Sequence, residues 1–214
     1  INENSTAVHT FTANETVTWS LNGGADASKF AINTSTGALS FSSTPDYESP
    51  ADANSDNDYV VVVRATDSAD NAVSKDYTIT VSDVNETPSA LALSASTFAE
   101  NAAGAAIGTL SATDPDSGET FTYSISGTDK DSFELDGTTL KLKDTVSADF
   151  ESDSSYAIIL TATDSGSKTV SKDYTISVTN VNETPSAVFL VEILKAMRGK
   201  SNISNEDAAR VSDL

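Results

Sequence analysis

Cysteine is absent from the sequence, and histidine, basic residues and long apolar runs are scarce. Without cysteine no disulfide braces the fold, but the absence does not fix the compartment, since many bacterial surface proteins also lack cysteine. The single histidine, His9, lies in the strand-like run "AVHTF" and offers little basis for Ser-His-Asp catalysis. No Gly-rich phosphate loop is present, and the acidic pairs that a glycosidase would need all belong to an internal repeat. We therefore predict that the chain is not an enzyme.

Positive charge is also scarce. The chain has 12 Lys and Arg against 32 Asp and Glu, a formal charge of −20. This balance argues against direct binding to nucleic acid or anionic lipid. No run of about 18 apolar residues exists, so we predict no direct membrane insertion. Apolar residues still make up 38% of the chain, which favours folded domains over disorder. Because the chain starts at Ile1 without Met, we expect it to be a piece of something longer.

An internal repeat organises the sequence. The linker-like stretch "DVNETPSA" (83–90) returns 97 residues later as "NVNETPSA" (180–187). "SKDYTITV" (74–81) likewise returns as "SKDYTISV" (171–178), with "RATDS" and "TATDS" before them. A period of this length is the size of one small β-sandwich.

The local pattern inside each repeat is that of β-strands. "YVVVVRAT" (59–66) and "YAIILTAT" (156–163) are β-branched runs separated from others by polar turns. We predict an all-β chain of two tandem Greek-key β-sandwiches, over residues 1–86 and 87–187. We expect the first to lack an opening strand, because "ALALSAS" (90–96) has no counterpart in the residues before Val17. Aromatic residues recur in register and are predicted to be core: Trp19 and Tyr123, Phe30 and Phe133, Tyr47 and Phe150, Tyr59 and Tyr156.

Acidic residues recur at fixed points of the repeat. Each copy has a Glu-Asn pair, an Asp-aromatic-Glu motif, an "ATDS" motif and a closing "VNETP", and the second also has "ATDPDSG". In this order the motifs resemble those of tandem cadherin repeats, most of all the cadherin-like repeats of large bacterial surface proteins. The resemblance covers residues 1 to about 187 and implies that neighbouring repeats and their linker share one calcium cluster.

Carried over residue by residue, the resemblance implies a Ca²⁺ site at the joint between the repeats. Its ligands would be Glu3, Asp46, Glu48, Asn85 through its carbonyl, Glu86, Asp114, Asp116 and Asp164. Carboxylate and carbonyl oxygens are the ligands that Ca²⁺ prefers. Weaker half-sites would be formed by Asp67, Glu100, Asp149, Glu151, Asn182 and Glu183.

The match has departures, and two alternatives stay open. Glu86 stands where the family usually has Asp, and Val84 replaces a common ligand position. The acids could instead be only the solvated face of an acidic protein. The loop "DANSDND" (52–58) has the alternate spacing of a calcium loop but lacks its Gly and closing Glu, which favours an inserted polar turn.

The last segment, 188–214, does not continue the repeat. "VFLVEILKAMRG" (188–199) has apolar residues on one helical face, which predicts a short, mainly helical tail.

Together these features predict a calcium-rigidified structural or adhesive segment of an extracellular or cell-surface protein, whose parent could be membrane-anchored. Its expected partners are other repeats of the same or a neighbouring protein. The alternatives are a carbohydrate-binding module, with polysaccharide as partner, and a subunit of an extracellular filament assembled by strand or helix exchange.

Overall fold

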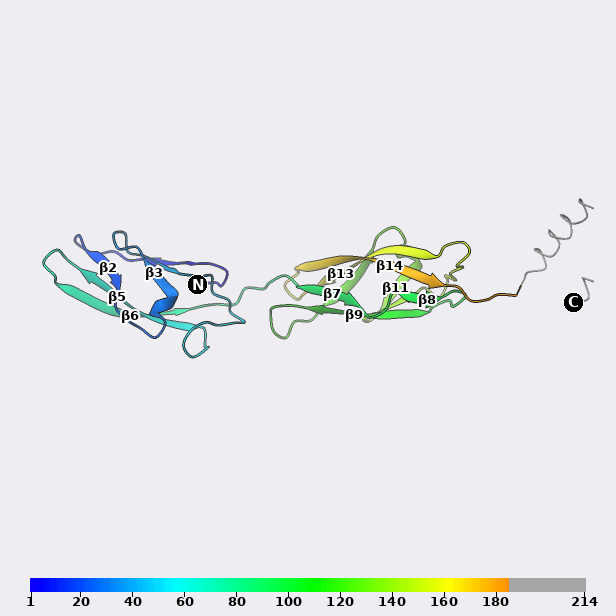
Figure 1. Cartoon of the computed structure of the whole chain (residues 1–214), viewed down its shortest axis with the longest axis horizontal. Coiled ribbons are helices and arrows are strands. Elements are labelled where there is room, and N and C mark those ends of the chain that lie inside the picture. The colour runs from blue at the N-terminus through cyan, green and yellow to red at the C-terminus, as the bar shows by residue number, and fades with distance from the viewer. Residues whose placement is uncertain (185–214) are drawn as a thin grey trace, which may run out of the picture.

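The computed structural model describes residues 1–184, and in them two β-sandwiches lie end to end (Figure 1). The predicted helical tail, 188–214, lies outside the described residues. Residues 1–184 contain no helix with the length and apolarity needed to cross a membrane. The all-β prediction is confirmed.

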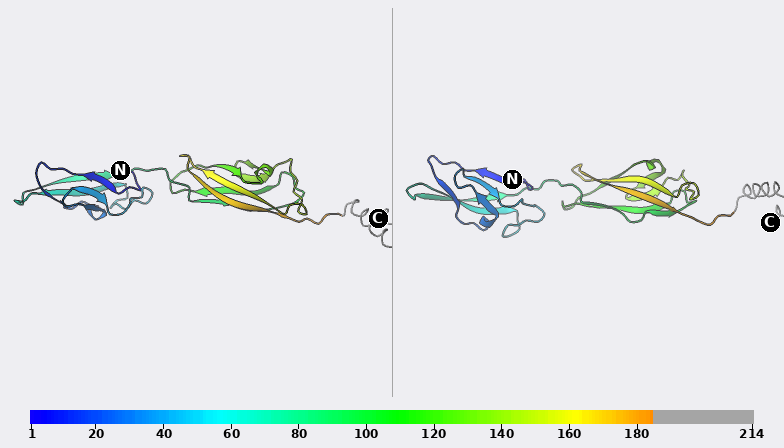
Figure 2. Two further views of the ribbon diagram at one scale, coloured as in Figure 1. Left: turned by 90° about the horizontal axis from the view of Figure 1, so that it is seen from above. Right: turned by 45° about the horizontal axis from the view of Figure 1, so that its top comes forward.

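The first sandwich is built from two three-stranded sheets, ordered β1-β4-β3 and β2-β5-β6. Figure 2 shows the two sandwiches, again end to end, in two further views. A short 3-10 turn, η1 (Ala27–Lys29), precedes β3. The strands are β1 (Ala7–Thr10), β2 (Thr18–Leu21), β3 (Phe30–Ile32), β4 (Ala38–Phe41), β5 (Asp58–Thr66) and β6 (Ala72–Thr80).

The second sandwich has two four-stranded sheets, ordered β11-β12-β9-β7 and β10-β13-β14-β8. All strand pairs are antiparallel except β14 with β8. The second 3-10 turn is η2 (Lys130–Ser132). The strands are β7 (Ala90–Leu93), β8 (Thr97–Ala99), β9 (Ala106–Thr113), β10 (Thr122–Ser126), β11 (Phe133–Asp136), β12 (Thr139–Leu142), β13 (Ser155–Thr163) and β14 (Thr169–Thr179).

Alternating side chains place a separate apolar core inside each sandwich. In β5 every second residue is buried, from Tyr59 to Ala65, and β13 buries Ile158, Leu160 and Ala162 in the same way. The two buried clusters share no residue. Each sandwich therefore has its own core, and the joint between them depends on other contacts.

The recurring aromatics follow the core prediction with one exception. Trp19, Phe30 and Tyr59 are buried in the first core, and the four aromatics of the second repeat lie in or against the second core. Tyr47 is 37% exposed, so the prediction is wrong there. Its loop is held through the backbone, because the Tyr47 N–H donates to a Glu3 carboxylate oxygen at 2.8 Å, and the ring is left at the surface.

Candidate metal site at the joint

The first acidic group lies at the end of the first sandwich that faces the second. Glu3, Asp46 and Glu48 each bring one carboxylate oxygen within 4.8 Å of the others. Glu3 is only 3% exposed, and its two oxygens accept the N–H groups of Tyr47 (2.8 Å) and Val84 (2.9 Å). One buried carboxylate therefore fixes both the loop that carries Asp46 and Glu48 and the start of the linker.

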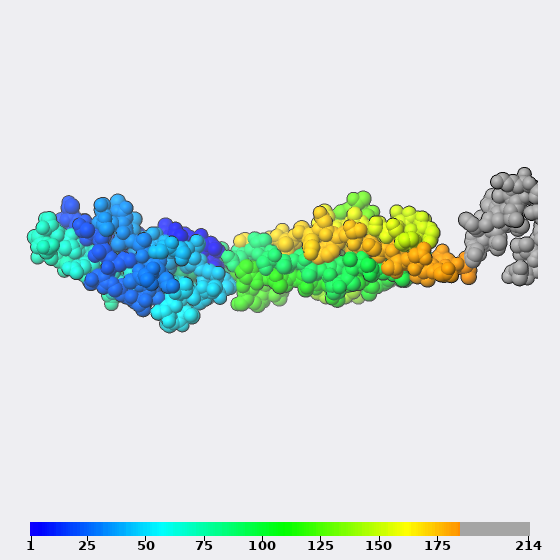
Figure 3. All heavy atoms as spheres, in the orientation of Figure 1, coloured from blue at the N-terminus to red at the C-terminus, as the bar shows by residue number. Residues whose placement is uncertain are grey.

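A second acidic group spans the joint itself. It takes Glu48 from the first sandwich, Asp83 from the linker and Asp116 from the loop after β9, again with ligand oxygens within 4.8 Å of one another. Asp116 is 8% exposed, and its Oδ2 accepts the N–H of Glu86 at 2.6 Å. Three separate parts of the chain thus converge on one point at the joint. Figure 3 shows the two sandwiches meeting end to end.

The linker also joins the second sandwich through Asn85. Its side-chain amide donates to Asp164 Oδ2 at 3.1 Å, and Asp164 Oδ1 accepts the Lys168 N–H at 2.7 Å. The Lys168 ammonium group donates to the Asn85 carbonyl, the oxygen that the resemblance implies as a metal ligand. A cationic group therefore already lies at this carbonyl, among the carboxylates of the joint.

The crowding of carboxylates makes their charged forms unfavourable. Burial raises the pKa of Glu48, and the nearby Glu3, Asp83 and Asp116 raise it further. Partial desolvation raises the pKa of Asp83, with Asp116 and Glu3 adding to the effect. Burial likewise raises the pKa of Asp114, next to Asp116. At neutral pH the joint thus concentrates more negative charge than the single ammonium group of Lys168 offsets.

Three carboxylate oxygens in this region are buried and have no hydrogen-bond partner among the described residues: Glu48 Oε2, Asp114 Oδ2 and Asp116 Oδ1. Buried polar atoms without a partner are uncommon in folded proteins because they cost free energy. Hard anionic oxygens from several segments are what Ca²⁺ coordinates. The residues present fit a divalent cation of this class.

Not every predicted ligand lies in one of the close groups. Asp114 adjoins Asp116, whose N–H it accepts at 3.1 Å. Glu86 instead accepts the side-chain amide of Asn4 at 2.8 Å, and Asp83 joins the close group across the joint. Asp83 was not among the ligands predicted from the linker, which were Asn85 and Glu86. The sequence feature that could have pointed to Asp83 is its position as the first residue of the linker motif "DVNETP".

The half-sites divide between the two outer ends of the molecule. Glu100, Asp149 and Glu151 form a third close group, and Glu100 accepts the N–H groups of Phe150 (2.8 Å) and Val181 (2.6 Å). This arrangement copies that of Glu3.

The remaining half-site residues are bound locally. Glu183 accepts from the Asn101 side chain, and Asn182 beside it is exposed. Asp67 is used within its own turn, where Asn71 donates to it and lowers its pKa. In the loop 52–58, Asp52 accepts three backbone N–H groups, as expected for a polar turn.

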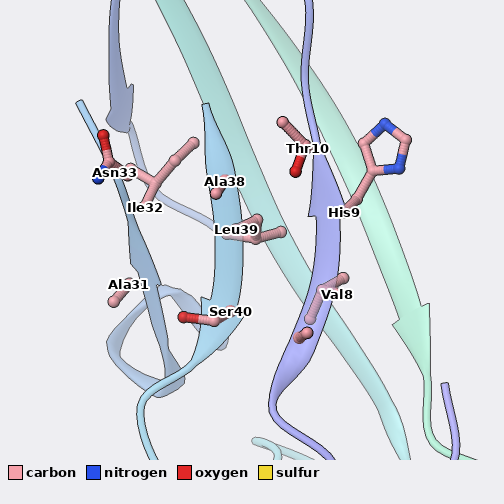
Figure 4. A pocket seen from close by; sticks show the side chains of 10 residues that line it. Val8, His9, Thr10, Ala31, Ile32, Asn33, Ala38, Leu39 and Ser40 are labelled. Atoms are coloured by element: carbon pink, nitrogen blue, oxygen red, sulfur yellow. The ribbon is translucent and has the colours of Figure 1, made fainter. Parts of the chain in front are cut away.

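A pocket on the first sandwich lies away from these acids. It covers the sheet β1-β4-β3, and Figure 4 shows Val8, Ile32 and Leu39 among its lining residues. His9 projects on the side of β1 opposite Leu39 (Figure 4). The lining has no acidic residue, so the pocket does not contribute to the candidate metal site.

Fold and site together define a tandem β-sandwich protein whose repeats meet at an acidic joint. Residues 94–179 match the family model of the cadherin domain. Most of the second sandwich thus matches the cadherin domain, and the chain has the fold of tandem cadherin-like repeats. No curated protein matches the chain.

Several solved structures share this fold. A protocadherin gamma B7 structure of domains EC3–6, described as a cis-dimer, is 24% identical, with 84% of this chain and 44% of that chain covered and a TM-score of 0.52. Extracellular cadherin domains 3–6 of protocadherin gamma B2 are 19% identical, with 86% of this chain and 45% of that chain covered and a TM-score of 0.57. Mouse cadherin-23 EC22–24 is 22% identical, with 86% of this chain and 63% of that chain covered and a TM-score of 0.55. The chain thus spans less than half the length of the first two.

Proposed function

We propose that the chain is a calcium-rigidified structural and adhesive segment of an extracellular or cell-surface protein, with Ca²⁺ held at the joint between the sandwiches. The observation that carries the proposal is the convergence of Glu48, Asp83 and Asp116, from the first sandwich, the linker and the second sandwich. Two of these three residues carry a buried oxygen without a partner.

The chain's own residues prepare the joint for this role. Glu3 fixes the linker to the first sandwich through the Val84 N–H, and Asp116 fixes it to the second through the Glu86 N–H. Because the two apolar cores are separate, polar contacts and charge decide how stiffly the repeats are aligned. Bound Ca²⁺ would supply the positive charge that offsets the mutual repulsion of the carboxylates.

A stiff joint suits a chain that spaces a binding surface from a cell or links one repeat protein to another. The proposed partners are therefore other repeats of the same or a neighbouring protein. The carbohydrate-binding alternative needs exposed aromatic rings, and in residues 1–184 Tyr47 is the only Phe, Tyr or Trp side chain classed as exposed. No observation favours that alternative over the first.

Calcium titration followed by thermal melting tests the proposal. We expect Ca²⁺ to raise the melting temperature relative to EDTA, since it binds only the folded joint. Glu48→Gln should abolish most of the shift. Glu151→Gln, the equivalent change at the outer end of the second sandwich, should leave it in place. An unchanged melting temperature in the wild-type chain, or equal losses in both variants, would overturn the joint assignment.

A further inference from the structure

Among residues 1–184, one basic side chain hydrogen-bonds to the linker, 83–86. Lys168 lies in the turn between β13 and β14 of the second sandwich, and its ammonium group donates to the Asn85 carbonyl. The other Lys side chains of this part of the chain that form ion pairs bind acids of the second sandwich itself. The contact therefore brings a single positive charge to the linker, next to the carboxylates of the joint.

The peptide group between Asn85 and Glu86 is held from both ends. Its C=O accepts the Lys168 ammonium group, and its N–H donates to Asp116 Oδ2 at 2.6 Å. A positive charge at the oxygen and a negative charge at the N–H polarise the peptide group in the same direction, so each hydrogen bond strengthens the other. The linker is thereby fixed to two loops of the second sandwich through charged groups of the chain itself.

Asn85 is also anchored to the turn of Lys168 through its side chain. The amide donates to Asp164 Oδ2 at 3.1 Å, while Asp164 Oδ1 accepts the backbone N–H of Lys168 at 2.7 Å. The Asn85 side chain packs on Gly166, where an added Cβ would collide with it. The ammonium group of Lys168 therefore meets a carbonyl whose position is already defined by other contacts.

The equivalent turn of the first sandwich shows what the lysine changes. Asn71 occupies the place of Lys168 one 97-residue period earlier. It donates both its backbone N–H (2.9 Å) and its side-chain amide (2.8 Å) to Asp67, so both oxygens of that carboxylate are used inside the turn. Because the Lys168 side chain extends to the linker instead, one oxygen of Asp164 stays free to accept Asn85.

Calcium and this ammonium group would compete for the Asn85 carbonyl, the oxygen that the resemblance implies as a metal ligand. A ligand oxygen lies about 2.3–2.6 Å from Ca²⁺, and a hydrogen-bonded nitrogen lies about 2.7–3.2 Å from its acceptor. Two positive charges on one oxygen would thus lie within about 6 Å of each other and repel. Lys168 is exposed, so its side chain can turn away into water.

We propose that Lys168 is a tethered cation that takes the place of calcium at the Asn85 carbonyl and thereby lowers the calcium affinity of the joint. This inference rests on the proposed function, because it concerns the same site. In the calcium-free chain Lys168 holds the linker on the second sandwich. When calcium binds, the ammonium group leaves the carbonyl, so the joint exchanges one positive group for another.

Calorimetric titration of the full chain with CaCl₂ tests the competition. Lys168→Met removes the charge and keeps the length of the side chain. It should bind calcium about three- to tenfold more tightly, since the ion no longer has to displace an exposed charge-assisted hydrogen bond. Lys168→Arg keeps a cation within reach of the carbonyl and should stay near the wild-type affinity. Lys172→Met is the matched control, because it removes the same charge from an exposed lysine that lies over the Tyr174 ring, and it should change the affinity far less.

Nuclear magnetic resonance gives a second measure that also works without calcium. In EDTA, Lys168→Met should make the Asn85 and Glu86 amide groups more mobile than in the wild-type chain, whereas Lys172→Met should not. Saturating CaCl₂ should shift the Lys168 ammonium resonance toward that of a free lysine and remove the difference in mobility. Equal mobility of the linker in all variants in EDTA would overturn the tether.

The outcomes separate this inference from the proposed function. If the wild-type chain binds calcium and Lys168→Met binds it equally or more weakly, the competition is wrong and the calcium joint stands. Equal gains in Lys168→Met and Lys172→Met would show an effect of overall charge alone and would overturn the role of Lys168. A wild-type chain that binds no calcium would overturn the proposed function, and the competition with it.

Discussion

Replacing Asp116 by Asn should change the joint in opposite directions with and without calcium. The substitution keeps the shape of the side chain and removes one negative charge. In calcium the loss of a carboxylate should weaken binding, and the alignment of the two sandwiches should loosen. In EDTA the same loss relieves repulsion from Glu48 and Asp83, and the alignment should tighten.

The magnitude follows from the geometry of the acidic group. Two unit charges whose oxygens lie within 4.8 Å of each other repel by at least about 3 kcal/mol at an effective dielectric constant of 20. Because Asp83 is solvent-exposed and salt screens the pair, we expect the calcium-free joint to gain about 1–2 kcal/mol. In calcium, loss of a direct ligand should cost at least about tenfold in affinity, since outer-shell partners of metals already cost about 10–100-fold.

Calorimetric titration measures the affinity, and spin labels measure the alignment. With cysteines placed at the exposed Thr36 and Thr138, the width of the distance distribution between the sandwiches reports joint stiffness. Asp149→Asn, in the acidic group at the outer end of the second sandwich, is the control and should leave the width unchanged. A broader distribution for Asp116→Asn in EDTA would show that Asp116 does not repel its neighbours there. An unchanged calcium affinity would show that Asp116 is not a ligand.

Three further predictions concern the surroundings of the site. Gly166→Ala should broaden the distance distribution in calcium, because a Cβ there collides with the Asn85 side chain. The turn itself accepts alanine, since Ala69 occupies the same place in the first repeat. A wild-type width would show that Asn85 is not held there. Leu160→Ala should lower the free energy of unfolding of the second sandwich by about 2–5 kcal/mol, since Leu160 is 0% exposed in that core. The melting temperature of the first sandwich, followed by the fluorescence of Trp19, should stay unchanged. A matching shift in that fluorescence would disprove independent cores. In EDTA the raised pKa values of the carboxyls of Glu48, Asp83 and Asp114 favour the folded joint at low pH, and this advantage is lost as pH rises through those values. Calcium binding should instead weaken as pH falls, because protons compete with the metal for the carboxylates. If the width of the distance distribution follows the same pH trend in calcium and in EDTA, the assignment is refuted.

Much of the fold could be predicted from the sequence because its signals are local and occur twice. Alternating runs such as 59–66 and 156–163 indicate strands with one buried face, and their repetition indicates two sandwiches. The bounds 1–86 and 87–187 stay a prediction, since residues beyond 184 are not described. Tyr47 was misplaced because register shows where a residue recurs, and not whether its loop turns it inward.

The candidate site was predictable in composition more than in contacts. The motifs indicated Glu3, Asp46, Glu48 and Asp116, which the fold brings together in two close groups. Asp83 was missed because the ligands expected from the linker were Asn85 and Glu86, and only the fold shows Asp83 beside Glu48 and Asp116. The position of Lys168 at the Asn85 carbonyl depends on how the two sandwiches meet, and no spacing in a linear sequence carries that information.

The most direct test of the calcium-stiffened joint is anomalous diffraction from crystals of the chain grown in calcium. We expect the strongest peak to lie among Glu48, Asp83 and Asp116, with weaker density or none at Glu100, Asp149 and Glu151. Density confined to the outer group, or no metal at either place, would contradict the role proposed for the joint.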